Sequence, residues 1–167
     1  MKKVFLIAIA AIGFTTVSFG ENPVSKATAT ATATVRTALS IVKAGDLSFG
    51  AFTVETAGTV AVGIDGLAEI TGGSVLTSET PATNAIFNIA GDNEGQFVLT
   101  LPTEVVELTD GVKPSMTIAP ASWVVTTGTT LSTEGKKTIN VGATLAFAAN
   151  QPVGSYSADF DVTVAYE

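Results

Sequence analysis

The sequence contains no cysteine and no histidine among its 167 residues. The lack of cysteine excludes disulfide cross-links and thiolate nucleophiles, and the lack of histidine removes the side chain that most often acts as a base or binds zinc. An enzyme built from this chain would have to rely on carboxylates. The fold must therefore be stabilised by its own core, by a partner or by assembly.

The first 20 residues have the pattern of a secretory signal peptide. Lys2 and Lys3 precede an apolar run over residues 4–12, and Ser18 and Gly20 occupy the −3 and −1 positions of a cleavage site after Gly20. The run is too short to span a bilayer, and there is no cysteine to carry a lipid. We therefore expect an exported mature protein, located outside the cell, on the cell surface or in a fimbrium.

Positive charge is scarce in the expected mature chain, where 6 basic residues stand against 15 acidic ones for a net charge of −9. The basic residues are scattered along the sequence: Lys26, Arg36, Lys43, Lys113, Lys136 and Lys137. Nucleic acids and anionic membrane surfaces are bound by clustered positive charge, which releases counterions on contact. We expect no binding to nucleic acid and no membrane insertion of the mature chain.

The mature chain shows short apolar or alternating segments separated by glycine-rich or polar turns, and no helical pattern of convincing length. Strands are predicted over residues 38–42, 47–54, 58–64, 67–76, 85–90, 96–101, 113–119, 123–126, 138–147 and 154–166. Asp65-Gly66 predicts a two-residue hairpin turn, and residues 91–95 predict a longer hairpin loop. This rhythm predicts an all-β, immunoglobulin-like two-sheet sandwich over residues 37–167.

Residues 26–41 hold the most regular pattern in the chain. Small apolar residues alternate with lysine and threonine, so a strand here would carry one apolar face: Ala27, Ala29, Ala31, Ala33 and Val35. These side chains bury little area at about 25 cal/mol per Å², so backbone hydrogen bonds of roughly 0.5–1.5 kcal/mol each must supply most of the stabilisation. Residues 21–36 are a candidate donor strand for a groove. The same pattern fits a first strand of the chain's own domain.

The C-terminal segment shows a second alternating pattern. After a predicted turn at residues 149–154, one face carries Tyr156, Ala158, Phe160, Val162, Val164 and Tyr166. Residues 138–147 have a matching apolar face, which predicts a long hairpin with residues 154–166. Gly154-x-Tyr156 is typical of the tyrosine corner before strand F of immunoglobulin-like sandwiches. On this reading the sandwich lacks its last strand, and the edge beside residues 156–166 is a candidate acceptor.

The alternating N-terminal segment, the motif GDLSFGAF at residues 45–52 and the ending NQPVGSYSADFDVTVAY at residues 150–166 carry a resemblance. They resemble an uncharacterised secreted-domain family of Gram-negative bacteria. The two ends more loosely resemble alpha-type fimbrial major subunits and the spore coat protein U-like domain, while residues 53–120 match only in strand rhythm. The fimbrial resemblance implies a sandwich without its last strand, whose groove is filled by a neighbouring subunit's N-terminal extension. A periplasmic chaperone fills it before assembly.

The candidate catalytic groups are carboxylates. Asp159 and Asp161 lie on the polar face of a predicted strand, and Asp92 and Glu94 lie in a predicted loop, where solvated surface residues are the simpler explanation. Asp92-Asn-Glu94 lacks the ligand spacing of a calcium loop, although a weak surface calcium site stays open. We expect no catalytic residue, no metal site and no cofactor.

Three functions are compatible with these patterns. The leading hypothesis is a pilin-like structural subunit of an extracellular fibre or surface coat, a homopolymer assembled by donor-strand complementation with the help of a chaperone and an outer-membrane usher. The alternative is a self-contained secreted sandwich that acts as a carbohydrate-binding or surface-coat module. In that case Trp123 would be the candidate sugar platform, although a core position is simpler. A carboxylate-based hydrolase is the third.

Overall fold

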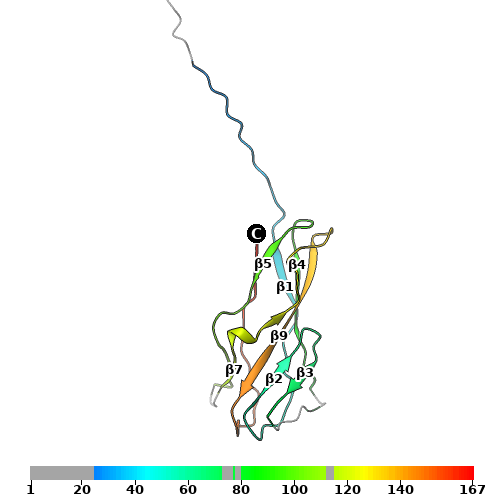
Figure 1. Cartoon of the computed structure of the whole chain (residues 1–167), viewed down its shortest axis with the longest axis vertical. Helices are drawn as coiled ribbons and strands as arrows, with labels where there is room; N and C mark the ends of the chain where they lie inside the picture. The colour runs from blue at the N-terminus through cyan, green and yellow to red at the C-terminus, as the bar shows by residue number, and fades with distance from the viewer. Residues whose placement is uncertain (1–24, 73–76, 78–79, 112–114) are drawn as a thin grey trace, which may run out of the picture. The chain divides into compact units, whose positions relative to one another are not determined.

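The computed structural model describes residues 25–72, 77, 80–111 and 115–167, so the predicted signal peptide lies outside the described residues. The chain divides into an N-terminal segment ending at Thr34 and a folded unit, Val35–Glu167. In its described part this unit contains ten strands and one short 3-10 helix, Pro120–Ser122 (Figure 1). The predicted all-β sandwich is confirmed.

Eight strands form one antiparallel sheet around β9 (Lys136–Phe147). The strand order is β1-β4-β9-β2-β3, with β7 and β8 also paired to β9 and β6 paired to β7. The first half of β9 pairs with β4 and the second half with β2, so β9 joins two halves of the sheet. The remaining bounds are β1 Ser40–Gly45, β2 Gly58–Val62, β3 Ala68–Ile70, β4 Ala85–Ala90, β6 Val106–Leu108, β7 Met116–Ile118 and β8 Val124–Val125.

The second sheet consists of β5 (Phe97–Thr100) and β10 (Thr163–Tyr166), which run antiparallel. Half-buried side chains from both strands pack against a buried cluster that β4 and β9 also supply. The cluster contains Ala85, Phe87, Ile89, Phe97, Leu131, Ile139 and Val141. Apart from Leu131, which lies in the loop before β9, period-two alternation places these residues on the inner faces of their strands, as a half-buried sheet requires. We call this group the upper cluster.

A lower cluster lies beneath the second half of β9 and contains Phe49, Val60, Val62, Met116, Ile118, Ala143, Leu145 and Phe147. Residues 47–54 cover it without forming a regular strand, so that strand prediction is wrong. Their side chains are nevertheless used, since the Phe52 and Phe147 rings lie 5.2 Å apart. Trp123 packs against both clusters and connects the two halves of the core.

The hairpin predicted at Asp65-Gly66 forms between β2 and β3, with a longer loop than predicted. The amide of Gly63 donates to the carbonyl of Leu67 at 2.9 Å, which leaves Ile64, Asp65 and Gly66 in the loop. Gly66 has a φ of +78°, a conformation that glycine adopts without steric cost. The hairpin predicted at residues 91–95 is wrong, because this loop crosses from β4 in one sheet to β5 in the other.

The long hairpin predicted between residues 138–147 and 154–166 is also wrong. β9 pairs with β2, β4, β7 and β8, whereas β10 pairs with β5. Phe160 and Val162 pack against the upper cluster, which contains Ile139 and Val141. The two matching apolar faces therefore meet across the sandwich rather than side by side in one sheet, a distinction that alternation alone cannot make.

The turn before the last strand has the geometry of a tyrosine corner, as predicted. The Tyr156 hydroxyl donates to the carbonyl of Pro152 at 2.8 Å, four residues upstream. This is the bond that marks the approach to strand F in immunoglobulin-like sandwiches. This bond fixes the turn that leads into β10.

The predicted strand over residues 26–41 forms only in its last part. Residues 25–39 belong to no strand, and Ala27, Ala29, Ala31, Ala33 and Val35 are all exposed. β1 begins at Ser40 and pairs with β4. Alanine methyl groups gain little from burial, so a strand of this composition needs a partner edge that supplies backbone hydrogen bonds.

Candidate functional site

The last strand, β10, has one edge without a partner strand in the described part of the chain. The amide of Glu167 donates to the carbonyl of Gln96 at 3.2 Å, on the β5 side. Successive residues of an antiparallel strand point their amide and carbonyl groups to opposite sides. Val164 and Tyr166 therefore direct these groups away from β5, where they form a row of free donors and acceptors.

β1 has a second free edge, because in the described residues it pairs only with β4. β1 and β10 are in direct contact, so both free edges lie on one side of the sandwich. Five apolar side chains on these two strands or just before them pack against the upper cluster yet stay only half-buried: Leu39, Ile41, Phe160, Val162 and Val164. We call this row the β1–β10 seam. Its side chains are thus only partly covered beside two edges that have no partner strand in the described residues.

Phe160 of the seam packs against the ring of Trp123. The Trp123 and Phe160 rings lie 4.8 Å apart at an interplanar angle of 42°, a tilted geometry that aromatic pairs favour. The indole nitrogen of Trp123 is buried and has no hydrogen-bond partner in the described structure. Trp123 is also the single tryptophan of the chain. Its fluorescence therefore reports on the environment of the seam.

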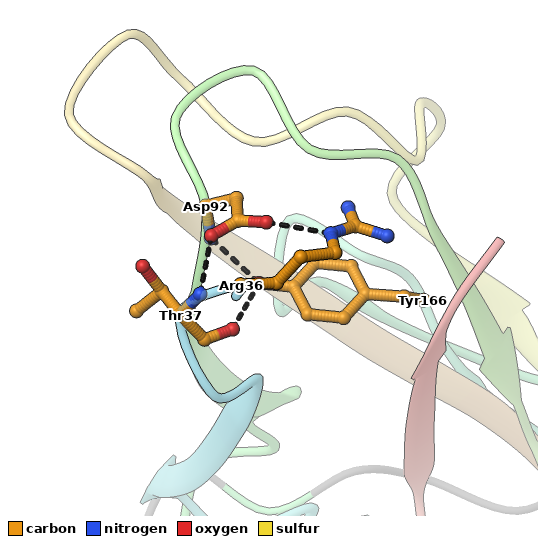
Figure 2. A network of polar contacts seen from close by, with 4 residues as sticks. All are labelled: Arg36, Thr37, Asp92 and Tyr166. Atoms are coloured by element: carbon orange, nitrogen blue, oxygen red, sulfur yellow. Dashed lines mark hydrogen bonds and ion pairs between the residues drawn. The ribbon is translucent and has the colours of Figure 1, made fainter. Parts of the chain in front are cut away.

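A polar clamp joins the ends of the seam strands (Figure 2). Asp92, after β4, accepts hydrogen bonds from Nε of Arg36 at 2.7 Å and from the amide of Thr37 at 2.6 Å. The Tyr166 hydroxyl donates to the Thr37 carbonyl at 2.9 Å and accepts from the Asp92 amide at 2.6 Å. The Arg36 guanidinium lies 4.0 Å from the centroid of the Tyr166 ring, a cation–π contact. We call these four residues the clamp.

The clamp is closely packed at its base. A Cβ added to Gly91 would lie 2.3 Å from the Tyr166 hydroxyl and 2.9 Å from Cδ1 of Leu39. A side chain at this position would have to displace the Tyr166 hydroxyl and the end of the Leu39 side chain. Since the N-terminal segment continues from Val35 and Arg36, the clamp fixes the point at which that segment leaves the domain.

Removing the tyrosine hydroxyl tests the clamp. Tyr166→Phe deletes one donated and one accepted hydrogen bond, so we expect a loss of about 1–3 kcal/mol of unfolding free energy. Chemical denaturation measures it, and Tyr156→Phe serves as the matched control because the Tyr156 hydroxyl donates one hydrogen bond, to the Pro152 carbonyl. A Tyr166→Phe loss no larger than that of Tyr156→Phe would show that the clamp contributes little.

The clamp should also weaken in acid. The hydrogen bond from Arg36, followed by that from the Thr37 amide, lowers the pKa of Asp92 below its ordinary value of 3.8. A carboxyl whose pKa is depressed by folding adds stability above the unfolded value, and this is lost as pH falls through the folded value. The difference in melting temperature between wild type and Asp92→Asn should therefore shrink below about pH 4. A difference that stays constant down to pH 2 would contradict this assignment.

The other predicted acidic sites are not brought together. Asp159 and Asp161 are exposed. Asp92 is used by the clamp, and Glu94 sits in the same loop with a φ of +55°. In the described ranges no three acidic side chains are placed to share a metal ion. Among the described residues, the carboxylates are thus exposed except that of Asp92, which is committed to an ion pair.

The structure divides the predicted acceptor residues among different environments. Phe160, Val162 and Val164 line the seam, Tyr156 packs against the lower cluster, and Tyr166 belongs to the clamp. Ala158 is exposed rather than part of the core. Sequence reasoning missed the clamp, since Arg36 and Asp92 are 56 residues apart and Thr37 and Tyr166 are 129 residues apart. The one feature of the sequence that points to the clamp is Arg36, a single arginine directly after the alternating segment.

Two hollows occur elsewhere on the surface. One, of about 530 Å³, lies over β1, β4 and β9 and is lined by residues that include Ser40, Asn88 and Thr138. The other, of about 360 Å³, lies beside β5 and β8. Neither is lined by the residues of the seam. No helix in the described residues is both long and apolar enough to cross a membrane.

Comparison with known proteins agrees with the coarse part of the sequence resemblance. Residues 39–166 match a family described as a domain of unknown function, DUF4402. The match runs from just before β1 through the end of β10 and so covers both strands of the seam. No curated protein and no solved structure matches the chain. The chain belongs to the DUF4402 family.

Proposed function

We propose that this protein is a structural subunit of an extracellular fibre or surface coat, assembled by donor-strand complementation. Residues 27–35 of one copy are the donor, and the β1–β10 seam of a second copy is the acceptor. The inserted strand pairs with the free edge of β10 and places its alanine face over the half-buried seam. The polymer is a homopolymer, and the function requires no catalytic group.

One observation carries this proposal. The same chain presents an apolar row that is half-buried along unpaired strand edges and an alternating apolar segment that is exposed. Each is unfavourable alone, because an open edge invites pairing with another chain and exposed apolar area costs free energy. Pairing the two removes both costs at once.

Export and handling follow from the same proposal. A subunit with an open seam would associate prematurely, so we propose that it is exported by the signal peptide and held by a periplasmic chaperone until an outer-membrane usher assembles it. Alternating strands of a chaperone could cover the same edge of β10. The resemblance of both chain ends to alpha-type fimbrial subunits supports this part of the proposal.

Deletion of residues 21–35 tests the proposal. The shortened chain keeps Arg36 and the whole clamp, so it should fold, remain monomeric in size-exclusion chromatography and form no fibres in negative-stain micrographs. A peptide of sequence KATATATATVR should then bind it and change the fluorescence of Trp123. The full mature chain should form polymers.

The self-contained module predicts different results. There, residues 26–35 complete the protein's own core, so the deletion lowers the melting temperature of a protein that was monomeric to begin with. A full mature chain that stays monomeric at high concentration would reject the fibre proposal in favour of the secreted module.

A further inference from the structure

We infer that the β1–β10 seam accepts only small side chains, so that it selects an alanine-rich strand and rejects strands with large apolar residues. This inference rests on the proposed function and specifies the partner strand that the seam takes. Large apolar residues would be the default expectation for a strand that completes a hydrophobic core. Three features of the seam point the other way.

The first feature is the floor of the seam. Leu39, Ile41, Phe160, Val162 and Val164 all pack against the buried upper cluster, so this floor consists mainly of large side chains. Phe160 is further held by its 4.8 Å stack on Trp123. An incoming side chain therefore meets a floor of apolar side chains that are already packed on the core.

The second feature is the closure of the seam at the clamp. The hydrogen bond from Tyr166 to the Thr37 carbonyl draws the end of β10 to the residues before β1. At this end even a methyl group on Gly91 would approach Leu39 and Tyr166 too closely. The spacing of the two edges is thus set by the clamp, and it cannot widen without breaking the bonds of Tyr166.

The third feature is the composition of the donor. Its inward positions are Ala27, Ala29, Ala31 and Ala33, with Val35 at the end nearest the clamp of its own domain. Alanine adds little apolar burial, so affinity comes from backbone pairing and specificity comes from exclusion of larger residues. Strands such as β9, with Ile139, Val141 and Leu145, are then rejected.

The central donor position gives the sharpest test. Ala31 is the middle residue of the donor's apolar face, so it faces the seam whichever way the donor runs. Ala31→Leu in the full mature chain should weaken assembly roughly tenfold or more, since overpacking at a filled site is costly. Thr32→Leu, on the opposite face, is the matched control and should assemble like wild type. The readout is the critical concentration for polymer formation.

A compensating change separates exclusion from other effects. Phe160→Val shortens the acceptor side chain, and it should restore assembly of Ala31→Leu while leaving Thr32→Leu unaffected. If wild type assembles and Ala31→Leu assembles equally well or more tightly, the size-selection inference is overturned while the fibre proposal stands. If wild type forms no polymer, both fail.

Discussion

Ala31→Asp should abolish polymer formation by the mature protein. In the proposed assembly Ala31 lies at the centre of the donor and faces the half-buried seam, so the substitution places an unpaired carboxylate against the apolar side chains of the seam. Burying such a charge costs at least several kcal/mol, which exceeds what four alanines contribute to binding. Size-exclusion chromatography and electron microscopy of the purified protein measure the result.

Thr32→Asp is the control for this experiment. Thr32 lies on the other face of the alternating segment, where an inserted strand meets solvent, so its replacement should leave assembly nearly unchanged. The melting temperature of the monomer should also be unchanged for both variants, because residues 25–34 belong to no strand of the folded unit. Equal loss of assembly in both variants would show that the segment acts by charge and not by one face.

Phe97→Ala should produce the largest loss of stability in the domain. Phe97 is 1% exposed, and it belongs to the upper cluster that also contacts the seam residues. Removing a buried phenylalanine ring leaves a cavity and typically costs about 3–5 kcal/mol. The free energy of unfolding, measured by denaturant titration, should fall by that amount.

Val98 provides a comparison on the same strand. It points to the opposite face of β5 and is 47% exposed, so Val98→Ala should cost less than about 1 kcal/mol. If the two substitutions destabilise the protein equally, the inner and outer faces of β5 have been assigned wrongly.

The sequence predicts which side of a strand is buried better than it predicts which strands pair with one another. β4 was predicted at its observed bounds because Ala85, Phe87 and Ile89 alternate with residues that are less buried or polar, and glycine follows at residue 91. Residues 47–54 have an equally apolar pattern and do pack on the core, yet they form no regular strand. Whether an apolar segment becomes a strand depends on a neighbouring edge, which is a property of the tertiary fold.

The last strand illustrates the same limit. Its inward row from Phe160 to Tyr166 followed from period-two alternation, and the tyrosine corner at Tyr156 followed from a short motif. The assignment of β10 to the sheet of β5 did not, because β9 presents an equally good apolar face. The clamp could not be predicted from the sequence for a related reason. Its polar contacts join Arg36, Asp92 and Tyr166 from three distant segments, and such contacts leave no periodic pattern in the sequence.

Hydrogen exchange along β10 tests the central claim most directly. Amides that bond to β5, such as that of Ala165, should be protected in both the monomer and the assembled polymer, while the amide of Val164 points to the free edge. Donor-strand insertion predicts that Val164 exchanges rapidly in the monomer and becomes protected on assembly, with Ala165 unchanged. Rapid exchange of Val164 in the polymer, or protection already present in the monomer, would contradict strand donation at this edge.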